Sequence, residues 1–490
     1  MRQFYAIVSA AAVLAACDSV HAATTYYVAT DGSDSNPGTQ AAPWKTIGKA
    51  ANTLVAGDTV NVRCGVYNEI ISPINSGKAG APITYEPDQS AAVTIDGSGF
   101  TDPAKLSAVA GLFNLRNKSY VNISGFHFVH SFGNGITVNE SSHIKIGDNT
   151  FNSDFGWSPI QVWDRGANQN HDIEIYGNYI RRTFLPTPTG SANPYYSWDV
   201  FQQDGQPWAE MISVRGGKNL SVHHNTIDYN QLGEGIDFAY GTQDSKIFNN
   251  TVRNTTSVAI YVDGSYAADR NARLTGNIDV YNNIVHCPAN FAIALANEAC
   301  REGTTTIDTV NICNNVIYGS RQALAIGCWA SWIGTNTAVV KNVKVINNTF
   351  YDCNTRGGAL IAVNKAFDWD KKHPDVRVSN VIFRNNLLFK GGVVVGTHGG
   401  NPIAAADHNG FHSGAAVFGT DAVVGDPLFV GALTGDFHLS AGSPFIDRGS
   451  AAGAPATDLD GRKRPQGAGC DIGAYEFHPD QRKSEGVAHP

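Results

Sequence analysis

The sequence predicts an all-β solenoid built from stacked coils, and three observations lead to this fold class. Short segments that alternate apolar and polar residues begin at Ile212, Ile236 and Ile260, a constant 24 residues apart. Alternation with period two is typical of a strand with one buried face. A fixed period built on strands marks a repeat architecture, in which each repeat packs on its neighbours. The composition agrees, because 51 glycines and only 16% charged residues suit many tight turns and few surface helices.

A second column runs beside the first and ends each time in asparagine. An asparagine at the same turn of every coil can hydrogen bond the backbone above and below and can tolerate the left-handed conformation. We therefore interpret the Asn-x-Thr triplets of this column as structural rather than as glycosylation sites. The column consists of Asn149, Asn178, Asn225, Asn250, Asn283, Asn315, Asn348 and Asn386.

The first column extends in both directions and sets the predicted limits of the solenoid. It includes Ile136 and Ile160 upstream, and Ile293, Leu324 and Ile361 downstream. We expect the parallel β-solenoid to cover residues 24–425. An amphipathic helix from Trp44 to Leu54 would cap its first edge. The period weakens after Lys390, so residues 426–477 are predicted to form a C-terminal cap, followed by a disordered tail over 478–490.

The N-terminus has the shape of a bacterial secretory signal over residues 1–23, with an apolar run from Phe4 to Ala16. Val20-His21-Ala22 fits signal cleavage, whereas Leu14-Ala15-Ala16-Cys17 resembles a lipoprotein box with a lipid anchor at Cys17. Either ending predicts a secreted, periplasmic or cell-surface protein without a membrane span. A monomer is expected.

The net charge and the cysteines indicate what the protein can bind and how it is cross-linked. A net charge of −8 and the lack of a basic stripe argue against nucleic-acid binding. Five cysteines fall between Cys287 and Cys353, which in an oxidising compartment predicts one or two disulfides between neighbouring coils.

Polar residues of the first column are predicted to share one open groove. If the isoleucines point inward, Arg215, Asp237, Tyr261 and Asp263 point outward from three coils stacked ~4.8 Å apart. We predict these four residues to be catalytic.

Glu210 and Glu234 share a further column at the strand starts, roughly 5 Å apart by the same spacing. Carboxylates that close need a cation or a shared proton. Loops inserted between coils would wall the groove. Trp163, Trp208 and Tyr240 are predicted to stack on sugar rings, and Glu298 to extend the acidic site.

Motifs at both ends of the chain resemble those of a known group. The opening Tyr26–Gly38 with Trp44-Lys-Thr-Ile47, and the closing Asp426–Phe477, are similar to segments of right-handed parallel β-helix proteins of the pectate-lyase superfamily. Gly233-Glu234-Gly235-Ile236-Asp237 resembles the calcium coil of family 9 polysaccharide lyases, which act on pectate. The resemblance implies Ca²⁺ bound by Glu210, Glu234 and Asp237. That family uses a lysine base on the following coil, but the segment Ala259–Asp263 has no lysine, so a different base or reaction is required.

Two mechanisms fit these residues. In a lyase, calcium would bind a uronate carboxylate, and Arg215, Tyr261, His223 or His224 would serve as base or charge stabiliser. In a hydrolase, Asp237 and Asp263, ~8 Å apart by strand geometry, would act as acid and base. The sequence predicts a secreted enzyme that cleaves an acidic polysaccharide by β-elimination. A glycoside hydrolase and a non-catalytic adhesive protein remain the alternatives.

Overall fold

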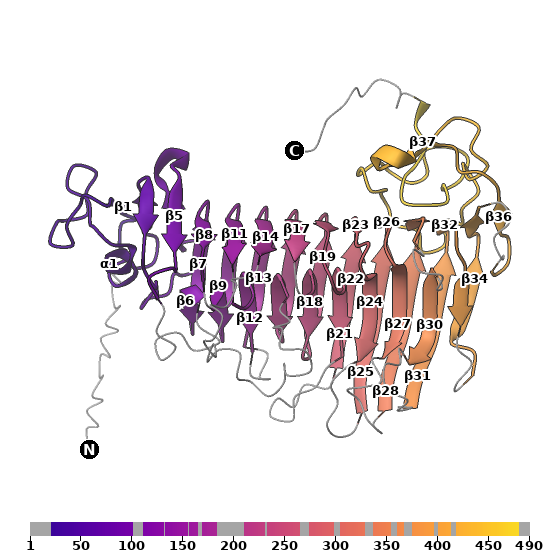
Figure 1. Ribbon diagram of the computed structural model, residues 1–490, viewed down its shortest axis with the longest axis horizontal. Helices are drawn as coiled ribbons and strands as arrows, with labels where there is room; N and C mark the ends of the chain where they lie inside the picture. The colour runs from indigo at the N-terminus through magenta and orange to yellow at the C-terminus, as the bar shows by residue number, and fades with distance from the viewer. Residues whose placement is uncertain are drawn as a thin grey trace, which may run out of the picture.

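The computed structural model describes residues 21–100, 111–131, 133–154, 156–164, 169–183, 210–230, 233–264, 274–297, 304–328, 337–353, 360–366, 375–395, 400–412 and 418–479. These residues form a right-handed parallel β-helix, as predicted. Figure 1 shows the strands side by side along one long axis, from the N-terminal to the C-terminal end of the chain. Three parallel sheets, here named A, B and C, run along this axis.

The strands of each sheet follow one another in chain order. Sheet A contains β1 (Thr25–Val28), β2 (Thr59–Val62), β4 (Ile83–Pro87), β7 (Ser119–Ser124), β10 (Ser142–Gly147), β13 (His171–Tyr176), β16 (Lys218–His223), β19 (Gln243–Phe248), β22 (Leu274–Tyr281), β25 (Thr304–Cys313), β28 (Thr337–Ile346), β31 (Asp375–Arg384) and β34 (Ile403–Asp407). Sheet B contains β3 (Gly65–Tyr67), β5 (Val93–Asp96), β8 (His127–Val129), β11 (Thr150–Asp154), β14 (Tyr179–Thr183), β17 (Thr226–Asn230), β20 (Thr251–Arg253), β23 (Ile284–His286), β26 (Val316–Tyr318), β29 (Thr349–Tyr351), β32 (Leu387–Phe389), β35 (Gly410–Phe411) and β36 (Val423–Val424). Sheet C contains β6 (Gly111–Arg116), β9 (Asn134–Asn139), β12 (Ile160–Trp163), β15 (Ile212–Arg215), β18 (Ile236–Ala239), β21 (Ile260–Asp263), β24 (Phe291–Asn297), β27 (Gln322–Cys328), β30 (Ile361–Ala366) and β33 (Val393–Val395).

The first column of the sequence is sheet C, and its register is the predicted one. Each apolar residue of the column pairs with the next along the chain and points into the core, where it is fully buried. Because successive side chains of a strand alternate between faces, this register also fixes which residues point outward. The paired residues are Ile136, Ile160, Ile212, Ile236, Ile260, Ile293, Leu324 and Ile361.

The asparagine column forms a buried ladder. The backbone N–H of each asparagine donates to the side-chain Oδ1 of the next one, at 2.9–3.1 Å. Each side-chain amide also donates to that oxygen and to a carbonyl of the preceding coil, as Asn250 does to Asn283 and Val222. The ladder continues one coil beyond the prediction, to Asn409.

The left-handed conformation expected of the ladder residues falls instead on the residue before each of them. These preceding residues have φ between 52° and 63° and turn the chain, which leaves the ladder asparagine free to aim its amide along the solenoid. Asparagine, aspartate, histidine and glycine are the types that tolerate this conformation most readily. They are Asp148, Gly177, His224, Asn249, Asn282, Asn314, Asn347, Asn385 and His408.

A helix lies at the N-terminal end of the β-helix, whereas the segment after β36 packs against sheet B, with the ring of Phe437 5.3 Å from that of Tyr318 and 5.0 Å from that of Tyr351. Helix α1 (Ile47–Ala51) is shorter than the predicted Trp44–Leu54, and it buries Ile47 and Ala50 against the first coils. Thr46 caps its N-terminus by accepting a hydrogen bond from Lys49 N. A 3-10 turn, η1 (Asp88–Ser90), lies between β4 and β5. After β36 the parallel sheets end, and β37 (Phe429–Gly431), η3 (Ala432–Thr434) and β38 (Asp436–Leu439) follow, with β37 antiparallel to β38.

Cys64, Cys287, Cys313, Cys353 and Cys470 are free thiols, so the disulfides expected between coils do not form at these positions. Cys287 is buried in the core, and its Sγ atom forms a hydrogen bond of 3.0 Å with Thr255 Oγ1. Cys300 lies outside the described residues. Among the residues described, no helix is long and apolar enough to cross a membrane.

The ladder predicts a strong effect for Asn250→Ala. The substitution removes the acceptor of Asn225 N and the donor to Val222 O, both buried. At about 1 kcal/mol per buried hydrogen bond, and more where a partner is orphaned, the free energy of unfolding should fall by about 2–4 kcal/mol. Urea denaturation measures this. Lys246→Ala, an exposed residue of the preceding strand β19, is the matched control and should change the free energy of unfolding by less than about 0.5 kcal/mol.

Candidate active site

Three carboxylates meet on the outer face of sheet C. Glu210 lies two residues before Ile212 of β15, Glu234 holds the same position before β18, and Asp237 is the second residue of β18. Each offers an oxygen atom, and these atoms all lie within 4.8 Å of one another. The structure thus brings together the three residues that the sequence predicts as metal ligands.

The backbone positions these acids by close approach of consecutive coils. Met211 N donates to the carbonyl oxygen of Glu234 at 3.1 Å, which fixes the two glutamate columns against each other. A Cβ atom added at Gly235 would lie 2.3 Å from the carbonyl oxygen of Ala259. Glycine between Glu234 and Asp237 is therefore a packing requirement, because any side chain there would push the coils apart.

Asp237 has a strongly perturbed environment. Burial raises the pKa of Asp237 well above its ordinary value, and three neighbouring carboxylates raise it further: Glu234, Asp263 and Glu210. The guanidinium of Arg215 opposes this shift only in part. A carboxyl group in such surroundings holds a proton or requires a cation.

Two carboxylate oxygens of the cluster are buried and lack a hydrogen-bond partner among the described residues, namely Glu210 Oε2 and Asp237 Oδ1. Buried polar atoms are normally paired, so these two oxygens are available as ligands for a cation. The donor set fits Ca²⁺, which prefers oxygen ligands at 2.3–2.6 Å, so that two ligands of one ion lie at most about 5 Å apart. The residues present therefore fit the cation that the resemblance implies.

Arg215 is held in place by an acid and by aromatic rings. Its guanidinium donates to Glu210 Oε1 at 3.0 Å and to Ser213 Oγ at 3.2 Å. Burial alone would lower the pKa of Arg215, but Glu210, Tyr240 and Asp237 outweigh it and raise the pKa above its ordinary value. Arg215 therefore stays charged and cannot act as the base.

Aromatic rings surround this guanidinium. Its carbon lies 5.7 Å from the ring centre of Trp157, 5.8 Å from that of Trp163 and 5.5 Å from that of Tyr240, within the range of cation–π attraction. Trp163 and Tyr240, predicted to stack on sugars, thus lie against an arginine, and sugar stacking by them stays a prediction. Sequence reasoning missed Trp157; its signal is its place three residues before Ile160, next to the column that carries Glu210 and Glu234.

Tyr261 points outward as predicted, but it is packed rather than open. Its hydroxyl donates to the carbonyl oxygen of Ala296 at 3.1 Å. Its ring is 1% exposed and belongs to a small apolar cluster on the outside of sheet C. A phenol that donates to a carbonyl in an apolar cluster is suited to structure more than to proton transfer. The cluster contains Val258, Tyr261, Phe291, Ala294, Ala296 and Ala325.

The prediction of an open groove is wrong for the acids as well. Asp237 is 3% exposed and Asp263 2% exposed. Strand alternation indicates which side chains leave the core, but it does not show that the outer face of sheet C carries a second layer of apolar and aromatic side chains. The register itself is as predicted, since Asp237 pairs with Tyr261 and Asp263 follows two residues later on that coil.

The prediction that His223 or His224 could act as the base is wrong. They lie at the end of β16 in sheet A, whereas the carboxylates belong to sheet C. The His223 ring stacks between Tyr176 and Phe248, at 5.8 and 4.7 Å, and contacts Glu174. Trp208 and Glu298, predicted to bind substrate, lie outside the described residues.

Replacing Asp237 with asparagine should stabilise the folded protein at neutral pH, because the carboxylate of Asp237 is unfavourable where it is buried. A carboxyl with a raised pKa stabilises the folded state below its unfolded pKa of about 3.9, and this stability is lost as the pH rises towards the folded value. With a chelator present, Asp237→Asn should therefore unfold at a higher temperature than the wild type at pH 7, and at the same temperature near pH 3. Thermal denaturation across this range measures the difference.

Asp244→Asn is the control with the opposite sign. A hydrogen bond from Asn277 and the ion pair with Lys218 lower the pKa of Asp244, so its charge stabilises the fold above pH 4. This variant should be less stable than the wild type at pH 7. If Asp237→Asn is instead less stable than the wild type at pH 7 in chelator, the ionised carboxylate of Asp237 does not destabilise the fold.

Comparison with known proteins supports the fold over most of the chain and finds a family-model match over part of it. Residues 26–179 match the Pel9A-like right-handed β-helix region. The uncharacterized protein YwoF of Bacillus subtilis strain 168 is 34% identical over 131 residues, which cover 25% of this chain and 27% of that protein. The chain thus spans about a quarter of the length of this curated relative.

Solved structures extend the likeness to the complete fold. The structure of XylC in complex with xylose is 14% identical, with a TM-score of 0.59, over 93% of this chain and 98% of that one. The crystal structure of pectate lyase Pel9A is 15% identical, with a TM-score of 0.47, over 93% and 96% of the two chains. The chain is therefore a right-handed parallel β-helix with a Pel9A-like region over residues 26–179, which ends before the carboxylates of the candidate site.

Proposed function

We propose that this protein is a secreted enzyme that cleaves an acidic, uronate-containing polysaccharide by calcium-assisted β-elimination. One observation carries the proposal: the oxygens of Glu210, Glu234 and Asp237 converge within 4.8 Å beside a charged arginine. The Pel9A-like region supports it, because it connects this chain with a β-helix named after a pectate lyase.

Each residue of the site would have a separate role in the reaction. Glu210, Glu234 and Asp237 would hold Ca²⁺, which when bound supplies positive charge to a uronate carboxylate and thereby acidifies the proton next to it. Arg215, fixed by Glu210 and its aromatic neighbours, would stabilise the negative charge that develops on the substrate. Of the four predicted catalytic residues, Arg215 stays charged, Asp237 would bind the cation and Tyr261 is packed in an apolar cluster. We therefore assign the base to Asp263, because a carboxylate can accept a proton.

A glycoside hydrolase is the second candidate, and the raised pKa of Asp237 favours it. A carboxylic acid with a raised pKa holds its proton to higher pH and could protonate a leaving group, while Asp263 would activate water. The two candidates differ in how the crowded acids are neutralised, by a cation in the lyase and by a proton in the hydrolase. We propose export for either enzyme, because residues 1–23 have the sequence pattern of a secretory signal.

Calcium titration tests the cation. Isothermal titration should show one Ca²⁺ site in the wild type, and Glu234→Gln should weaken it by about tenfold or more, because affinity follows the number of charged ligands. Glu174→Gln, on the outer face of sheet A, is the matched control and should leave the affinity unchanged. Equal affinity in the wild type and in Glu234→Gln would refute the site.

Substrate assays separate the reaction classes. A panel of pectate, alginate and, because of the likeness to XylC, acidic xylan is incubated with the enzyme in calcium or in chelator. A lyase forms an unsaturated uronide that absorbs in the ultraviolet and stops in chelator, whereas a hydrolase forms reducing ends without that absorbance. Asp263→Asn should lower turnover by about 10²–10⁴-fold in either case. Glycan binding without cleavage of any substrate would instead indicate an adhesive protein.

A further inference from the structure

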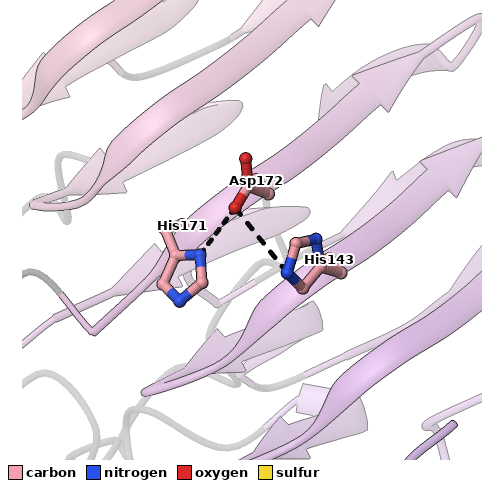
Figure 2. Close-up of side chains that lie close together, drawn as sticks. All are labelled: His143, His171 and Asp172. Carbon is pink, nitrogen blue, oxygen red and sulfur yellow. Dashed lines mark hydrogen bonds and ion pairs between the residues drawn. The ribbon is translucent and has the colours of Figure 1, made fainter. Parts of the chain in front are cut away.

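A second group of metal-binding side chains lies on sheet A, away from the carboxylates of sheet C. His143 belongs to β10, and His171 and Asp172 open β13. Asp172 Oδ2 lies 2.7 Å from His171 Nδ1 and 3.8 Å from His143 Nε2 (Figure 2). The two imidazole nitrogens and the carboxylate oxygen all lie within 4.8 Å of one another.

The backbone explains why these side chains meet. His143 and Asp172 occupy equivalent places in consecutive coils, since Ser142 pairs with His171 and Ile144 pairs with Ile173. Both adopt the left-handed conformation, with φ of 53° and 55°, and so leave the regular alternation of the strand. Most coils place asparagine or aspartate here, and histidine also tolerates this conformation, so His143 can occupy the turn and point its ring outward beside Asp172.

Neighbouring residues hold two of the three groups in place. Tyr120, one coil earlier, stacks on the His143 ring with a centroid separation of 4.2 Å and an interplanar angle of 10°. Asn219, one coil later, donates to Asp172 Oδ1, which leaves Oδ2 for the histidines. Such outer contacts are typical of metal sites, where they orient the ligands.

The chemistry of the group selects the ion. Two imidazole nitrogens and one carboxylate suit zinc and other divalent transition ions, whereas calcium and magnesium prefer oxygen alone. Ligands about 2.0–2.2 Å from a tetrahedral zinc ion stand about 3.3 Å apart, and the observed 2.7 and 3.8 Å lie on either side of this value. The three side chains are 35–43% exposed, so an ion can enter and a water molecule can complete its coordination.

We propose that His143, His171 and Asp172 form a binding site for a divalent transition-metal ion of the zinc class, with an open coordination position. The site joins the coils of β10 and β13 on the outside of sheet A. It is independent of the proposed calcium site, which differs in sheet, in ligand type and in preferred ion.

Zinc binding to the full chain, purified without a polyhistidine tag and stripped of metal, tests the proposal. Titrations are carried out in excess Ca²⁺, to occupy the carboxylates of sheet C, and in a Cys64→Ser background, because the Cys64 thiol is exposed. One zinc ion should bind and raise the unfolding temperature, since a ligand that binds only the folded state stabilises it. Cobalt in place of zinc should give the visible absorption of a bound ion with nitrogen ligands.

The variants identify the ligands. His143→Gln, His171→Gln and Asp172→Asn should each weaken zinc binding more than Asn219→Ala, for which loss of an outer contact predicts about a tenfold effect. His127→Gln, an exposed histidine on sheet B, is the matched control and should bind zinc as the wild type does. Circular dichroism confirms that each variant is folded.

The opposite results would overturn the proposal. A wild type that binds zinc no more tightly than the His143→Gln/His171→Gln double variant shows that the group is only a hydrogen-bonded cluster. Equal losses in His127→Gln and His171→Gln show nonspecific binding to surface histidines. Neither result bears on the calcium site, which is measured separately with Glu234→Gln.

Discussion

Each coil of the β-helix donates a backbone N–H and a side-chain N–H to the Asn Oδ1 of the next coil, from Asn149 to Asn409. A slip of one residue between coils would orphan these donors in the core, at a cost of several hydrogen bonds. The ladder therefore holds the register at one turn. From there the alternation of each strand decides which side chains leave the core. The meeting of Glu210, Glu234 and Asp237 depends on this register, as does that of His143 with Asp172.

The sequence was sufficient for features that repeat. The 24-residue spacing of Ile212, Ile236 and Ile260 predicts their pairing, and the Asn-Asn pairs predict the ladder. Features that depend on how side chains pack in three dimensions could not be predicted from the repeat. Alternation places Tyr261 on the outer face, but it does not show that this face is itself packed. Similarly, the repeat does not show how far the asparagine column lies from the column of acids. His223, a candidate base beside the asparagine column, belongs to a different sheet from the carboxylates.

The candidate site concentrates negative charge where little water reaches it. Arg215 offsets one carboxylate through its bond to Glu210, whereas burial and the neighbouring carboxylates keep the pKa of Asp237 raised. A dication and a proton are the two physical solutions, and they correspond to the two reactions proposed. The family match ends at residue 179, before any of these side chains, so the roles proposed for them rest on their local chemistry.

The coils of β15, β18 and β21 contain no insertion between their inward isoleucines at 212, 236 and 260. Genes for repeated structures change length by duplication or loss of whole repeats. A coil gained elsewhere would lengthen the molecule and leave the acids in contact. A coil gained between Glu210 and Glu234 would separate them by a further ~4.8 Å, and the three carboxylates would no longer lie together. The interval from Glu210 to Glu234 therefore cannot gain a coil without loss of the carboxylate cluster.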